Sequence, residues 1–140
     1  FGEGVTTVTF FKGSSETAAI HLKERLALVA QSNPWLFGRL VKEKQHGKRA
    51  ALRFSSSPSV TEAEFTVDTS LNLTEELGYE EITKRVADSG AKIPQGRLLL
   101  NKPLPVSKLT VAPSEGDGKS FAVIFSLSHT IANGGTYFQI

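Results

Sequence analysis

Five consecutive apolar residues, Phe121 to Phe125, constrain the fold more than any other feature of this chain. Successive side chains of a β-strand point to opposite faces of the sheet, so a strand that is apolar throughout must be buried on both faces. The sequence therefore predicts that the strand from Ser120 to Ser128 lies centrally in a covered sheet.

The spacing of apolar residues predicts the other elements. Thr alternates with Val and Phe from Val5 to Phe11, which indicates a half-buried strand. Helical spacing predicts a long helix that is capped by Ser14 or Ser15 and ended by Asn33-Pro34. The middle of the chain is expected to form a hairpin of Leu36 to Lys44 and Arg49 to Ser55, with Trp35 at its start and in the core, and a short strand at Phe65 and Val67. A second helix is then expected, with Tyr79, Ile82 and Val86 on one face and its end at Ser89-Gly90, before an irregular connection from Ile93 to Pro105 with an extended piece at Arg97 to Leu100. The last part is expected to contain a strand from Ser107 to Ala112, a turn at Glu115 to Gly118, and a turn at His129 to Gly135 before a helix from Thr136.

Length and composition indicate one α/β (α+β) domain, a mixed β-sheet flanked by helices, over residues 1–140. With 39% hydrophobic and 21% charged residues the chain is typical of globular proteins, and no apolar run approaches the roughly 20 residues that a membrane span needs. There is no cysteine, and Phe1 to Phe11 does not resemble a signal peptide. We therefore expect a cytoplasmic protein.

Charge is unevenly distributed although the net charge is only +2. Arginine and lysine on the predicted hairpin indicate the solvated side of a β-ribbon, and no aromatic residues interleave with them, so we expect no nucleic-acid partner. An acidic block from Glu62 to Glu81 is expected to offset this charge across the surface. The basic residues are Arg39, Lys42, Lys44, His46, Lys48, Arg49 and Arg53.

Two familiar kinds of site are not supported by the spacing. Gly118-Lys119-Ser120 imitates the end of a phosphate-binding loop, but Pro113 stands where that motif needs glycine. His21, His46 and His129 belong to separate elements, so we expect no bound metal.

One histidine, His129, has a sequence context that suits a general base. The central strand leads into Ser128-His129, and a turn containing Asn133-Gly134-Gly135 follows. An imidazole titrates near neutrality, a strand fixes its position and glycines permit close approach, all of which suit a general base. The alternative is a structural histidine satisfied by backbone hydrogen bonds.

The stretch from His129 to Gly134 resembles the H-x-x-x-D-G motif of the chloramphenicol acetyltransferase-like superfamily, which includes plant BAHD acyltransferases and condensation domains. His129 matches the motif histidine and Gly134 its glycine, while Asn133 replaces the aspartate that holds the site's architecture. Ser128 stands where condensation domains carry a second histidine, which leans towards the BAHD-like branch. Upstream, Pro34 to Leu40 is similar to the family segment hP-x-L-x-G-R-L.

The resemblance implies that the chain is the N-terminal lobe of a two-lobed fold. The C-terminal lobe, from residues after Ile140 or from a partner chain, is then expected to complete the site. It also implies acyl transfer from a thioester such as acyl-CoA, the co-substrate, to a hydroxyl or amine of a small acceptor, with His129 as general base and no bound cofactor. Asn133 and the short length favour an alternative, a non-catalytic structural or interaction module of the same fold. An unrelated α/β binding domain is the third possibility.

Overall fold

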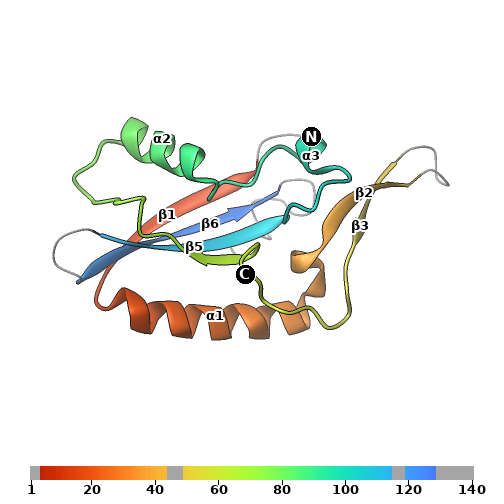
Figure 1. Cartoon of the computed structure of the whole chain (residues 1–140), viewed down its shortest axis with the longest axis horizontal. Helices are drawn as coiled ribbons and strands as arrows, with labels where there is room; N and C mark the ends of the chain where they lie inside the picture. Colours follow the sequence, from red (N-terminus) through yellow and green to blue (C-terminus); the bar gives the residue numbers. More distant parts are fainter. Residues whose placement is uncertain (1–3, 44–48, 115–118, 129–140) are drawn as a thin grey trace.

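The computed structural model describes residues 4–43, 49–114 and 119–128. A four-stranded sheet lies between α1 (Ser15–Ser32) on one face and α2 (Tyr79–Ser89) on the other (Figure 1). The strand order is β1-β6-β5-β4, in which β4 runs parallel to β5 and the other neighbours are antiparallel. The strands are β1 (Val5–Lys12), β4 (Phe65–Val67), β5 (Ser107–Pro113) and β6 (Ser120–Leu127). The predicted mixed sheet flanked by helices is confirmed.

The apolar strand is central, as its sequence predicts. β6 pairs along its whole length with β1 on one side and with β5 for most of its length on the other. On one face Phe121 shares an apolar cluster with Leu26 of α1. On the other face Ile124, which is fully buried, shares a second cluster with Val86 of α2. Burial on both faces explains why this strand carries no alternation of apolar and polar residues.

The ends of the two main helices follow from local chemistry. The Ser14 hydroxyl accepts a hydrogen bond from the Thr17 amide (3.3 Å), and α1 ends at Asn33 before Pro34. α2 ends at Gly90, whose φ of +82° lies in the left-handed region that favours glycine. Both predicted helices are thereby confirmed. Of the three residues predicted on one face of α2, Ile82 and Val86 pack against the sheet, whereas Tyr79 is 83% exposed.

The segment before the hairpin is not a strand. Pro34–Phe37 forms a 3-10 turn, η1, because Pro34 presets a helical φ and the Leu36 and Gly38 amides donate to carbonyls three residues back. Trp35 therefore does not start a strand, although it packs against the α1 cluster as expected. The hairpin itself is confirmed in shorter form, and β2 (Arg39–Glu43) and β3 (Arg49–Arg53) make a separate two-stranded sheet.

The long connection between α2 and β5 contains a helical turn instead of the predicted extended piece. This turn, α3 (Gly96–Leu99), places Leu99 wholly inside a third apolar cluster with Leu40, Ile93 and Val106. The cluster joins the hairpin to the same end of the sheet at which β6 finishes (Figure 1).

None of the helices in the described part of the chain has the length and apolar character to cross a membrane.

Candidate functional site

The three site residues predicted from the sequence, His129, Asn133 and Gly134, lie outside the described residues, as does the predicted turn that holds them. What the structure does describe is the strand that leads to them, as far as Ser128. The base of the candidate site is therefore the C-terminal end of β6 and the segments around it.

Strands on both sides hold the end of β6. Leu127 pairs with Val5 of β1 and with Ser107 of β5. One residue later the Ser128 amide donates a hydrogen bond to the Val106 carbonyl (2.9 Å). Leu127 and Ser128 are each 1% exposed. The residue bonded to His129 is thus fixed by backbone pairing and by burial.

Gly4 packs directly against this strand end. A β-carbon on residue 4 would lie 2.5 Å from the Leu127 carbonyl oxygen and 3.5 Å from the Ser128 α-carbon. The first distance is well inside van der Waals contact, so only glycine permits this approach. The close packing of Gly4 limits movement of the end of β6 on the β1 side.

A buried polar cluster lies three residues before His129. The hydroxyls of Ser126 and Thr6 are hydrogen-bonded to each other (2.8 Å), and the Ile93 amide donates to the Ser126 hydroxyl (2.8 Å). Ser126 has no exposed surface. We call these three residues the β6 latch. It joins β6, β1 and the connection after α2, and the sequence analysis missed it, although a serine within an apolar strand was a visible signal.

The opposite face of the sheet has its own polar attachment. Ser107, 2% exposed, donates its hydroxyl hydrogen to the Leu36 carbonyl (2.6 Å), which ties η1 to β5. The segment Pro34 to Leu40, on which part of the family resemblance depends, is thereby placed beside the strand that pairs with the end of β6.

An ion pair holds the next part of this segment. The Arg39 guanidinium contacts a Glu64 carboxylate oxygen at 2.9 Å, and the Thr61 hydroxyl donates to the other oxygen (2.5 Å). The Glu64 side chain is 3% exposed. Arg39 and Glu64 were expected as solvated surface charges, and for this pair the expectation is wrong. Their attraction in a partly buried setting connects the hairpin to the chain before β4.

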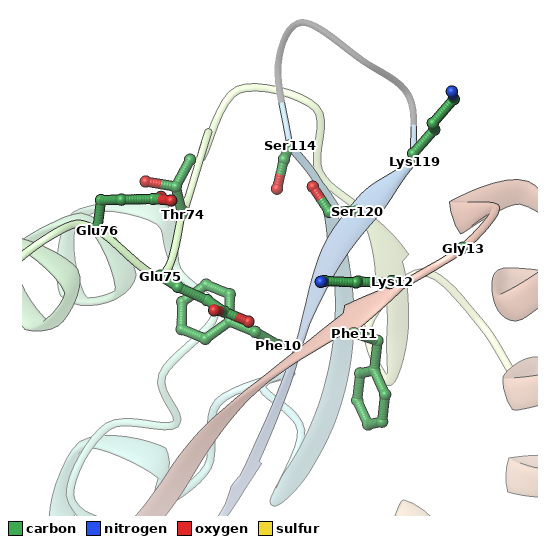
Figure 2. Close-up of a pocket in the computed structure, with 10 residues that line it drawn as sticks. All are labelled: Phe10, Phe11, Lys12, Gly13, Thr74, Glu75, Glu76, Ser114, Lys119 and Ser120. Carbon is green, nitrogen blue, oxygen red and sulfur yellow. The ribbon is translucent and has the colours of Figure 1, made fainter.

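A pocket among the described residues lies at the other end of the sheet (Figure 2). It has a volume of about 730 Å³ and is lined by Phe10, Phe11, Lys12, Gly13, Thr74, Glu75, Glu76, Ser114, Lys119 and Ser120. Ser120 begins β6 and Leu127 ends it, so the pocket lies roughly 20 Å along the strand from the residues before His129. In Figure 2 the Lys119 side chain points away from the carboxylates of Glu75 and Glu76, whereas the Lys12 side chain extends toward the side of the pocket where Glu75 lies. This pocket is not part of the predicted site.

Metal ligands do not gather in the described part of the chain, where no three His, Asp or Glu side chains form a group able to hold an ion. Of the three histidines from which no metal site was expected, His21 is an exposed residue of α1, and His46 and His129 lie outside the described residues.

Comparison with known proteins identifies the fold. No protein-family model matches this chain, and no curated protein sequence does. The SgcC5 protein from Streptomyces globisporus, in complex with (R)-(-)-1-(2-naphthyl)-1,2-ethanediol and sucrose, matches 96% of the chain with a TM-score of 0.59 and 17% identity. A structure that concerns condensation domain-mediated chain release from the enacyloxin polyketide synthase matches 91% with a TM-score of 0.52 and 16% identity.

The chain shares a condensation-domain-like fold with part of each protein. It spans 27% of the SgcC5 chain and 22% of the chain from the enacyloxin polyketide synthase. At these identities the likeness establishes the architecture alone. The predicted chloramphenicol acetyltransferase-like architecture is confirmed to that extent, while membership of the superfamily and the branch within it stay predictions.

Proposed function

We propose that the chain is the N-terminal lobe of an acyltransferase that moves an acyl group from a thioester, such as acyl-CoA, to a hydroxyl or amine, with His129 as the general base. The observation that carries the proposal is that Ser128, the residue before His129 in the sequence, lies at the fixed end of the central strand of a condensation-domain-like sheet. A base that follows such a fixed residue would need little reorganisation to meet its substrate.

The reaction uses no cofactor and no covalent enzyme intermediate. Neutral His129 accepts the proton of the acceptor O–H or N–H while that oxygen or nitrogen attacks the thioester carbonyl. The carbon–sulfur bond then breaks, and the imidazolium returns the proton to the thiolate that leaves. General-base catalysis of this kind contributes about 10²- to 10⁴-fold to the rate. The C-terminal lobe, or a partner chain, completes the site and supplies the donors that stabilise the oxyanion.

The test measures release of free thiol from acyl-CoA by the full-length protein with hydroxyl and amine acceptors. His129→Ala should lower kcat at least a hundredfold, on the scale of general-base catalysis. His21→Ala is the matched control, because His21 is an exposed histidine of α1 and its loss should leave turnover unchanged. Equal turnover by wild type and His129→Ala would refute the proposal.

A second candidate is a non-catalytic structural or interaction module of the same fold. Asn133 favours it, because an amide keeps hydrogen bonding but lacks the charge of the aspartate in the motif. The same assay separates the two functions, since a non-catalytic module releases no thiol with any acceptor, and Asn133→Asp would not create turnover.

A further inference from the structure

The β6 latch joins three segments of the chain near the C-terminal end of β6. Thr6 and Ser126 are 120 residues apart in sequence, and their hydroxyl oxygens lie 2.8 Å from one another. The Ile93 amide donates to the same Ser126 oxygen from a third segment. Three separate parts of the chain therefore meet at a single serine.

The hydrogen-bonding capacity of Ser126 is well used at this point. A hydroxyl offers one hydrogen and two lone pairs. Here one lone pair accepts from the Ile93 amide, and either the hydrogen or the second lone pair makes the bond with Thr6. Because Ser126 is wholly buried, no solvent reaches its hydroxyl to replace the Thr6 hydroxyl when the latter is removed. A buried hydroxyl that loses its partner is costly, so the strand would shift to find another.

We propose that Thr6 and Ser126 are positioning residues for His129, and that the β6 latch holds the strand end at the place from which the imidazole reaches the acceptor. This inference rests on the proposed function. Ser126 lies three residues before His129, and pairing with β1 and β5 transmits its position along β6. A misplacement of about 1 Å is enough to reduce catalysis on the order of a hundredfold.

Three substitutions test the proposal in the full-length protein. Thr6→Val replaces the hydroxyl with a methyl group of similar volume and should lower kcat roughly tenfold while KM for the acyl thioester changes less than about twofold. Thr6→Ser retains the hydroxyl and should restore kcat. Thr66→Val is the matched control, because Thr66 lies on the same face of the sheet at the far edge, is half-buried and donates its hydroxyl hydrogen to the Glu62 carbonyl (2.8 Å). Its kcat should equal that of the wild type.

The decisive readout is the His129→Ala background. If the latch acts through His129, Thr6→Val lowers kcat in the wild type and leaves the residual rate of His129→Ala unchanged. If the latch had a merely structural role, Thr6→Val would lower the rate in the wild type and in the His129→Ala variant alike, and that result overturns the proposal. An unchanged kcat for Thr6→Val would also overturn it, as would a Thr6→Ser variant as slow as Thr6→Val. If His129→Ala itself lowers kcat while Thr6→Val does not, the positioning role alone fails. If His129→Ala has no effect, the proposed function fails.

Discussion

Gly4 is the position at which one added methyl group should disturb the candidate site most directly. In Gly4→Ala the new β-carbon would lie 2.5 Å from the Leu127 carbonyl oxygen, whereas an ordinary contact begins near 3.4 Å. The backbone must therefore separate by about 0.9 Å. Leu127 cannot simply retreat, because it is paired to Val5 and Ser107 on its two sides. Overpacking of this kind costs about 1–3 kcal/mol of folding free energy.

Thermal unfolding followed by circular dichroism measures this cost. For a chain of this size a loss of 1–3 kcal/mol lowers the Tm by roughly 3–10 °C. The displacement reaches Ser128, so under the proposed function kcat for thiol release by the full-length protein should fall as well. Gly78→Ala is the control, because Gly78 has φ of −68° and a β-carbon there would meet nothing within 4 Å.

The control should leave stability nearly unchanged. At Gly78 the lower entropy of the unfolded alanine chain and the poorer helix N-cap oppose each other, each by about 0.5–1 kcal/mol. If Gly4→Ala and Gly78→Ala unfold at the same temperature, the end of β6 accommodates a β-carbon at residue 4 without displacement, and the reasoning is refuted.

Four further substitutions probe the framework by urea denaturation. Arg39→Met leaves the buried Glu64 carboxylate without its cation and should lower the free energy of unfolding by about 2–3 kcal/mol. Glu64→Gln keeps a hydrogen-bonding group and should lower it less. Equal losses for the two variants would show that the ion pair is solvent-screened. Ile124→Ala should cost about 2–5 kcal/mol because the side chain is fully buried, and a cost below 1 kcal/mol would contradict the central placement of β6. Gly90→Ala should cost about 1–2 kcal/mol because φ is +82°, and a stabilised variant would mean that α2 does not end there in a left-handed residue.

The candidate site could be predicted from the sequence only in part. The motif from His129 to Gly134 singled out a base and its turn, and these remain predictions. The structure adds the latch of Thr6, Ser126 and Ile93: the serine within an apolar strand is visible in the sequence, but no local pattern identifies Thr6 and Ile93 as its partners. A serine or threonine has the same local preferences whether its hydroxyl meets solvent or a partner 120 residues away.

Where the sequence analysis was wrong, a local pattern was overridden by packing. Leu36 and Phe37 look like the start of a strand, but Pro34 favours a helical turn and both side chains are buried in the core. Arg39 and Glu64 look like surface charges, but the fold buries one against the other. For Arg39 and Glu64 the deciding partner is 25 residues away in sequence, whereas for Leu36 and Phe37 the nearby Pro34 was a local signal that the prediction did not use.

The sequence by itself determined the local elements. Apolar residues on both faces of Phe121 to Phe125 require a covered central strand, Ser14 begins α1, and Gly90 ends α2, because side-chain periodicity and backbone dihedral preferences act over a few residues. Only the tertiary structure decided the strand order β1-β6-β5-β4, the parallel pairing of β4 with β5, and the anchoring of the end of β6 by Gly4, Ser126 and Val106. These depend on contacts between segments far apart in the chain, whose free energy is realised only when the whole sheet assembles.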